Sequence, residues 1–265
     1  MKKIVSILAV GLIGALFSTG ALAQDRIRVG TTAGSDVAIL EKAKEVAARD
    51  GLIVEIIEFS DYVRPNLALA DKEIDLNAFQ HLPYLETFCR DRGLDLVSIG
   101  LTYVAPLSFY SKKIKSFDEL KEGDTITIAN DPTNGGRGLM LLEKAGLIKL
   151  KEGIGLTATP FDIVENRLKL KIVAVDAAQT PRTLEDAAAA AVNNTYATDA
   201  GLQPVRDAIY REEAKGSPYA NIIAVRAEDK DNPLYHKFVK AYQNKEVADF
   251  IMERYEGSSL PVFDY

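Results

Sequence analysis

One arginine beside a glycine-rich segment is the residue of this sequence best suited to bind an anion. Arg137 follows the turn-forming segment 130–136, NDPTNGG, which separates an alternating β-branched strand at 125–128 from an apolar run at helical spacing. Free backbone N–H groups and the positive end of a helix meet at such a segment, and a guanidinium group matches a carboxylate or phosphate. We therefore expect an anion site with Arg137 opening the helix. An ordinary turn whose arginine faces solvent is the alternative, and a nucleotide is disfavoured because the P-loop and GxGxxG patterns are missing.

Aromatic residues form the second group that could bind a small molecule. In the run NAFQHLPY at 77–84, Phe79 and His81 point to the same side of an extended segment, and Tyr84 follows on the first helical turn. With Tyr62, they predict an aromatic pocket wall that is apolar on its ring faces and polar at its edges. Core aromatics around a hydrogen-bonded histidine are the alternative that the sequence leaves open.

Alternating strands and helices must position these two groups. The apolar patterns predict strands at 27–29, 52–59, 74–79, 96–104, 125–128, 169–175, 187–192 and 221–225. They predict helices at 35–50, 67–70, 83–92, 137–145, 193–200, 234–242 and 245–255. Crossing from strand to strand through helices places ligand-binding loops at the carboxyl ends of the strands.

Three of these elements depend on a choice. Ser35 or Asp36 is expected to cap the first helix. The nearly unbroken apolar run 52–59 is typical of a strand buried on both faces of a parallel sheet. The five alanines of 187–191 favour a helix by propensity, but their position between two loops favours a short buried strand, which we prefer.

Interruptions near 103–106 and 219–222 predict that the chain crosses twice between two lobes. The expected fold is an α/β protein with the second lobe inserted into the first: 24–104 and 222–265 form lobe 1, and 105–221 form lobe 2. The two terminal helices would return to pack on lobe 1. A ligand would then bind in the cleft between the lobes.

The start of the chain and its composition point to export. A charged start, an apolar run at 4–17 and the small-x-small sequence 21–23 predict a secretory signal peptide, 1–23, cut after Ala23. The chain has 32 basic and 38 acidic residues, which disfavours nucleic acid as a partner. Its single cysteine, Cys89, is expected in the core, and export without an internal disulfide suggests a bacterial periplasm.

Six motifs follow one another along the chain: NAFQHLPYL, YSKKIKSFDEL, NDPTNGGRGLMLLEKAGLIKLK, DIVEN, AAQTPRTLED and SPYANIIAVR. Together they resemble the NlpA family of methionine-binding proteins, the solute-capturing subunits of methionine ABC importers. The resemblance implies a type II periplasmic binding-protein fold whose two α/β lobes close over a free amino acid, usually L-methionine. It also implies an ABC permease and ATPase complex in the inner membrane as partner.

The same resemblance implies a set of ligand-binding residues. Arg137 would hold the α-carboxylate of the ligand, and Asn193 and Asn221 would orient its α-ammonium group. The aromatic wall would consist of Tyr62, Phe79, His81 and Tyr84. Aromatic rings suit a thioether sulfur, at about 0.3–1.5 kcal/mol per contact. Without the resemblance, the two asparagines would be explained as turn and strand-edge amides bonded to the backbone.

Two departures from the family pattern bear on these expectations. Gln24 follows the signal sequence where most family members have a cysteine that carries a lipid, so we expect a freely diffusing periplasmic protein without a lipid anchor. Leu82 stands where a lysine is common, but its aromatic neighbours are present.

Two other functions remain open at this point. The first is a protein of the same fold that binds another amino acid or a methionine-containing dipeptide. The second is a periplasmic enzyme with His81 as general acid–base. The sequence has two histidines, His81 and His236, and shows no nucleophile elbow and no metal-ligand spacing. We therefore expect no catalytic residue, no metal and no cofactor.

Overall fold

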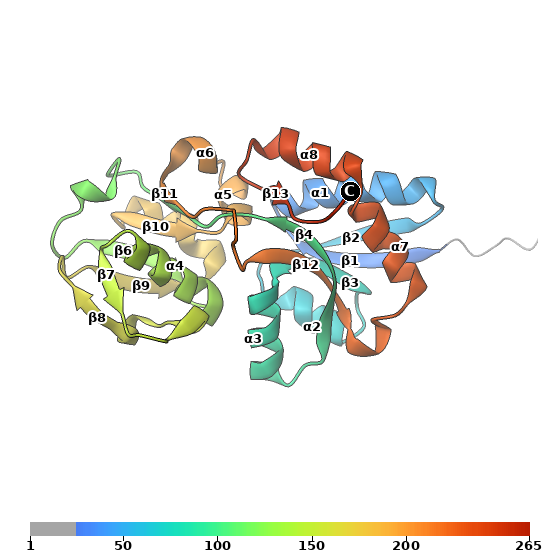
Figure 1. The fold of residues 1–265 in the computed structure, drawn as a ribbon, viewed down its shortest axis with the longest axis horizontal. Coiled ribbons are helices and arrows are strands. Elements are labelled where there is room, and N and C mark those ends of the chain that lie inside the picture. The colour runs from blue at the N-terminus through green and yellow to red at the C-terminus, as the bar shows by residue number, and fades with distance from the viewer. Residues whose placement is uncertain (1–24) are drawn as a thin grey trace, which may run out of the picture.

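Two α/β lobes make up the structure, a computed structural model that describes residues 25–265 (Figure 1). The first sheet has the strand order β13-β4-β12-β3-β1-β2 and the second has the order β11-β5-β10-β6-β9. The predicted two-lobed fold, with one lobe inserted into the other, is confirmed. The predicted signal peptide and the expected lack of a lipid anchor concern residues outside the described part of the chain.

The bounds of the elements follow the chain. The strands are β1 Arg26–Thr32, β2 Ile53–Phe59, β3 Leu76–His81, β4 Leu96–Val104, β5 Ser108–Tyr110, β6 Thr125–Ala129, β7 Ile148–Leu150, β8 Ile163–Asn166, β9 Lys171–Val175, β10 Ala189–Val192, β11 Ala208–Arg211, β12 Ala220–Arg226 and β13 Leu260–Pro261. The helices are α1 Ser35–Arg49, α2 Arg64–Ala70, α3 Leu82–Arg92, α4 Pro132–Lys144, α5 Asn194–Asp199, α6 Pro204–Asp207, α7 Pro233–Tyr242 and α8 Lys245–Tyr255. Within residues 25–265, none of the helices combines the length and the apolar character needed to span a membrane.

Helices cover both faces of the first sheet. α1, α7 and α8 share one hydrophobic core with the sheet, and α2 and α3 pack against its other face (Figure 1). The expected return of the terminal helices to lobe 1 is confirmed. β2 was expected to be buried on both faces, which is wrong: it is the edge strand, and its residues are mostly half-buried or exposed.

The second sheet contains the alanine-rich strand. β10 pairs in parallel with β6 and antiparallel with β5, and its four residues are all buried. The choice of a strand over a helix for this segment is therefore confirmed. Alanine has no intrinsic preference for strands. The strand is therefore stabilised by its burial between α4 and the 3-10 helix Ala177–Glu185.

The chain passes between the lobes at two adjacent places. β4 ends at Val104 in the first sheet, and β5 begins at Ser108 in the second. The return path leaves β11 at Arg211 and enters β12 at Ala220, which pairs with Val104. The two sheets thus contain the strands expected for each lobe, while the residue-level lobe boundaries of the sequence analysis stay predictions.

The glycine-rich segment is helical, and the prediction that it forms a loop is wrong. α4 begins at Pro132, so Arg137 lies in its second turn rather than at its start. The N-cap residue is Asp131, whose carboxylate accepts a hydrogen bond from the backbone N–H of Asn134 at 2.9 Å. This carboxylate occupies the helix end where an external anion was expected, and the predicted backbone anion site is therefore wrong as well.

Close backbone approaches explain why glycines lie within a helix here. A Cβ at Gly135 would lie 2.7 Å from Ala129 O, and one at Gly136 would lie 2.4 Å from Leu156 O. A similarly close backbone approach occurs at the start of α1, where the predicted N-cap is wrong. The N-cap is Gly34 rather than Ser35 or Asp36, with φ at 100° and only 2.5 Å between its ideal Cβ and Thr195 O.

The substitution Gly136→Ala should destabilise the protein by about 1–3 kcal/mol, because the added methyl group would force two backbone segments apart. Gly138→Ala in the same helix is the control. Its Cβ would meet a side-chain atom of Ile128 at 3.1 Å, and the gain in helix propensity offsets that contact. Urea denaturation measures both changes. A Gly136→Ala variant as stable as Gly138→Ala would contradict the proposed packing.

Candidate ligand-binding site

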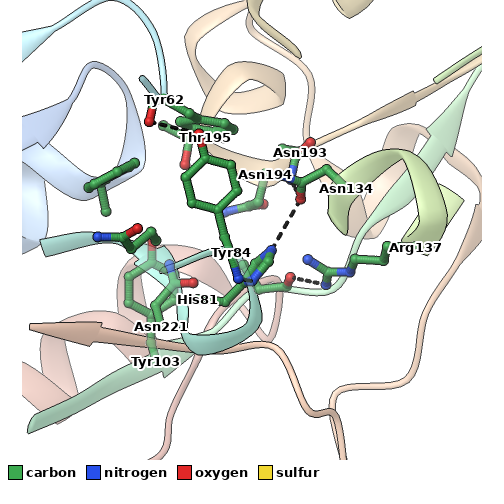
Figure 2. Close-up of a pocket in the computed structure, with 13 residues that line it drawn as sticks. Tyr62, His81, Tyr84, Tyr103, Asn134, Arg137, Asn193, Asn194, Thr195 and Asn221 are labelled. Carbon is green, nitrogen blue, oxygen red and sulfur yellow. Dashed lines mark hydrogen bonds between the residues drawn. The ribbon is translucent and has the colours of Figure 1, made fainter. Parts of the chain in front are cut away.

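A cavity between the two lobes contains all seven residues proposed from the sequence (Figure 2). Tyr62, Phe79, His81 and Tyr84 come from lobe 1, Arg137 and Asn193 come from lobe 2, and Asn221 lies on β12 of the first sheet, at the predicted lobe boundary. The lining consists of Tyr62, Phe79, Gln80, His81, Tyr84, Tyr103, Ala105, Asn134, Arg137, Asn193, Asn194, Thr195 and Asn221. The carboxyl ends of β3 and β10 meet here, which is where ligands bind in open α/β sheets.

Aromatic rings of lobe 1 form one side of the cavity. The ring centroids of Tyr62 and Phe79 are 5.9 Å apart, and that of Tyr84 lies 6.1 Å from Tyr62 and 6.3 Å from Phe79. The Tyr84 hydroxyl donates to Tyr62 O at 2.9 Å, which fixes the loop after β2 against α3. Tyr196 of lobe 2 packs on Tyr62, with 4.7 Å between the ring centroids. The predicted aromatic wall is present as a geometric feature.

His81 is held as a neutral imidazole. Its Nδ1 accepts a hydrogen bond from the backbone N–H of Tyr84 at 3.1 Å, so the proton lies on Nε2. Nε2 is 3.2 Å from Asn134 Oδ1, and this bond joins lobe 1 to lobe 2. Burial and the nearby charge of Arg137 lower the pKa of His81 to about 3.

Arg137 is buried in an ion pair. Nε lies 2.9 Å from Glu212 Oε1, and Nη2 lies 2.5 Å from Glu212 Oε2 and 2.9 Å from Ala105 O. The guanidinium carbon lies 4.1 Å from the centroid of the Tyr219 ring. These contacts use Nε and Nη2, and Figure 2 shows the end of the guanidinium group directed toward His81 and the cavity. The arginine thus does not face solvent, and one edge of it remains available to a ligand.

The asparagines supply amide groups opposite the rings. Asn193 Nδ2 donates to Asn134 Oδ1 at 2.8 Å, while the buried Asn193 Oδ1 has no hydrogen-bond partner among residues 25–265. Asn194 Oδ1 is in the same situation. A buried acceptor without a donor is costly, so these oxygens favour a ligand that donates hydrogen bonds. Asn221 lines the cavity from β12, where it pairs with His81 of β3.

Sequence reasoning missed several lining residues, of which Asn134 matters most. Its Nδ2 donates to both carboxylate oxygens of Asp131 at 3.0 Å, and its Oδ1 serves His81 and Asn193. Asn134 and Arg137 are three residues apart on α4 and therefore share a face. The correct helix start would have revealed this pair. Tyr103 and Thr195 were also missed, and both contact the buried carboxylate of Asp36.

Nothing in the described part of the chain gathers three or more His, Cys, Asp or Glu side chains in an arrangement that could hold a metal ion. Cys89 is half-buried against the core beside Leu85, and burial raises the pKa of its thiol.

The cavity combines one guanidinium edge, unpaired amide oxygens and aromatic rings. Such a site can bind a small molecule that has an anionic group, a donor group and an apolar part.

Comparison with known proteins identifies relatives along nearly the whole chain. The sequence profile described as NlpA lipoprotein matches residues 27–263. A protein of Salmonella typhimurium named D-methionine-binding lipoprotein MetQ is 49% identical over 259 residues, which cover 94% of this chain and 95% of that protein.

Two solved structures are similar in fold and sequence. A nutrient binding protein from Burkholderia cenocepacia, described as bound to methionine, has a TM-score of 0.87 and 50% identity, covering 89% of this chain and 100% of that one. A periplasmic substrate-binding protein of an ABC transporter from Coxiella burnetii has a TM-score of 0.86 and 48% identity, with 89% and 100% coverage.

The low pKa of His81 predicts a pH-dependent loss of stability. Between pH 7 and pH 4.5 the unfolded chain takes up a proton at His81, whose ordinary pKa is about 6.5, while the folded protein does not. The wild type should therefore lose about 2–3 kcal/mol more of its free energy of unfolding in this interval than a His81→Asn variant, which keeps a side-chain oxygen to cap α3.

Urea denaturation of both proteins at the two pH values measures this difference. Burial raises the pKa of Asp36 to about 7, an effect of opposite sign, but it contributes equally to both proteins and cancels. Equal losses in wild type and variant would show that His81 is protonated in the folded protein.

Proposed function

The chain belongs to the NlpA lipoprotein family, and on this premise we propose that it is a periplasmic binding protein that captures L-methionine or a close relative between its lobes for an ABC importer. One observation carries the proposal: the guanidinium group of Arg137 and the buried Asn193 Oδ1, which has no hydrogen-bond partner within residues 25–265, line the same cavity as the aromatic rings. These groups complement the two charged ends of an amino acid.

Arg137 would bind the α-carboxylate through the edge of its guanidinium group that Glu212 leaves open. A charge-assisted hydrogen bond is stronger than a neutral one, and a bond to the buried Arg137 would fix the orientation of the ligand. Asn193 and Asn221 would accept hydrogen bonds from the α-ammonium group. Asn193 supports this role because its Oδ1 is buried and unpaired.

The thioether chain would lie against Tyr62, Phe79 and Tyr84, with His81 beside them. Sulfur near aromatic ring edges contributes about 0.3–1.5 kcal/mol per contact. His81 has both ring nitrogens engaged in hydrogen bonds and stays neutral, so it would shape the pocket without carrying charge. The same bonds speak against its use as a general acid–base, and the relatives are named as binding proteins rather than enzymes.

The spacing of the polar groups favours a free amino acid over a dipeptide. Asn134 and Arg137 are one helical turn apart, and Asn193 is hydrogen-bonded to Asn134 at 2.8 Å. Asn134 therefore connects the residues proposed to hold the carboxylate and the ammonium group, as expected for a ligand that carries both groups on one Cα atom. Another amino acid, the D-enantiomer named for the Salmonella relative, and a methionine-containing dipeptide are the ligands to compare with L-methionine.

The proposed partners are an ABC permease and its ATPase in the inner membrane, which would receive the ligand. A periplasmic location agrees with the description of the Coxiella relative. The expected lack of a lipid anchor stays an untested prediction. The relatives are named lipoproteins, and Gln24 lies outside the described residues.

The substitution Arg137→Ala should weaken binding of L-methionine at least roughly tenfold, because it removes a buried charge-assisted partner worth about 1.5–3 kcal/mol. Titration calorimetry with L-methionine, D-methionine, leucine and a methionine dipeptide measures the affinities. Arg206→Ala, at an exposed arginine of the same lobe, is the control and should bind like the wild type. A folded Arg137→Ala protein with unchanged affinity would refute the proposed carboxylate site.

A further inference from the structure

The charged residues around the cavity differ between its lining and the residues that contact the lining. Among the described residues that line it, Arg137 alone carries a full charge, since His81 is neutral. Four polar residues of the lining are hydrogen-bonded to acidic residues: Arg137 to Glu212, Asn134 to Asp131, and both Tyr103 and Thr195 to Asp36. None of the three carboxylates is itself a lining residue. An ammonium group in the cavity would therefore meet neutral oxygens, and the negative charge paired with Arg137 lies on Glu212 outside the lining.

Glu212 is the most firmly fixed of these three carboxylates. It bonds to Nε and Nη2 of Arg137, and its Oε2 also accepts from the backbone N–H of Leu107 at 2.9 Å. Its side chain is 14% exposed and that of Arg137 is 3% exposed. The pair lies where Ala105 and Leu107 lead the chain into lobe 2, so both partners are fixed by backbone groups.

The net charge of this pair decides which ligands are compatible with the cavity. Arg137 and Glu212 together are neutral, and an amino acid zwitterion is neutral as well, so binding leaves no excess charge in a buried place. A carboxylate without an ammonium group would add one uncompensated negative charge, which is costly away from water. Without Glu212, the cavity would hold the net positive charge of Arg137 and would favour such an anion.

We propose that Glu212 acts through Arg137 as a specificity-determining residue, which makes the pocket select a zwitterion over a carboxylate that lacks an ammonium group. The inference rests on the proposed function, because it assumes that an amino acid binds at Arg137. It assigns to Glu212 a role in selecting the charge class of the ligand, beyond holding the arginine in place.

The test compares two ligands that share the same carboxylate and thioether chain. L-Methionine and its deaminated analogue 4-methylthiobutanoate are titrated into the wild type and into Glu212→Gln. In general, a unit charge on the order of 10 Å from a charged group, at an effective dielectric constant of about 20, changes a binding constant roughly tenfold. The preference for methionine, given by the ratio of the two dissociation constants, should therefore fall roughly tenfold in Glu212→Gln.

Glu213→Gln is the matched control. It removes the same charge one residue further along, from a side chain that is 78% exposed and paired with Lys144 at the surface. Its preference for methionine should equal that of the wild type. If Glu212→Gln does not fold, as judged by circular dichroism, Glu212→Asn replaces it as a second neutral variant.

Two results would overturn the proposal in distinguishable ways. If Glu212→Gln binds both ligands more weakly by the same factor, Glu212 only holds Arg137 and does not select the charge class. If the wild type does not bind methionine, the proposed function fails, and the inference fails with it.

Discussion

The buried pair of Arg137 and Glu212 is the interaction on which the arrangement of the site depends. A charge in the interior is tolerated only with a partner, and the partner here is fixed beside the first crossing between the lobes. Because Glu212 and Ala105 engage Nε and Nη2, the remaining edge of the guanidinium group is held toward the cavity (Figure 2). The rings of lobe 1 and the amides of lobe 2 then lie around this edge. The same residue that would bind the ligand therefore also ties α4 to the segment that connects the lobes.

Much of the fold could be predicted because the chain carries strong local patterns. β4 and α8 have the predicted bounds, Leu96–Val104 and Lys245–Tyr255, since each is a continuous apolar or amphipathic run with clear ends. The short strands β5 and β11 were not predicted. They are only three and four residues long. β5 pairs with both β10 and β11, and β11 pairs with β5, which no local pattern reveals.

The glycine-rich segment shows where local reasoning fails. Two adjacent glycines and a proline are typical of a turn, yet here Pro132 occupies the first helical position and the glycines allow other backbone segments to approach. The contacts that require them come from Ala129 and Leu156 and depend on tertiary packing. The error displaced the start of α4 and concealed that Asn134 and Arg137 share a face.

The candidate site was predicted in part. The seven residues chosen from the sequence line one cavity, which their types and the family resemblance could suggest, whereas their individual binding roles stay proposals. Glu212 was missed because it lies 75 residues beyond Arg137 in a segment without a motif. A buried carboxylate cannot be told from a surface one by residue type, and its importance follows only from its burial and its contacts.

A crystal structure of the protein with L-methionine would test the central claim most directly. The account predicts the carboxylate of the ligand within hydrogen-bond distance of Arg137, the ammonium group at Asn193 Oδ1, and the sulfur among the rings of Tyr62, Phe79 and Tyr84, with the Arg137–Glu212 pair intact. A methionine bound elsewhere, or bound in this cavity without contact to Arg137, would contradict it.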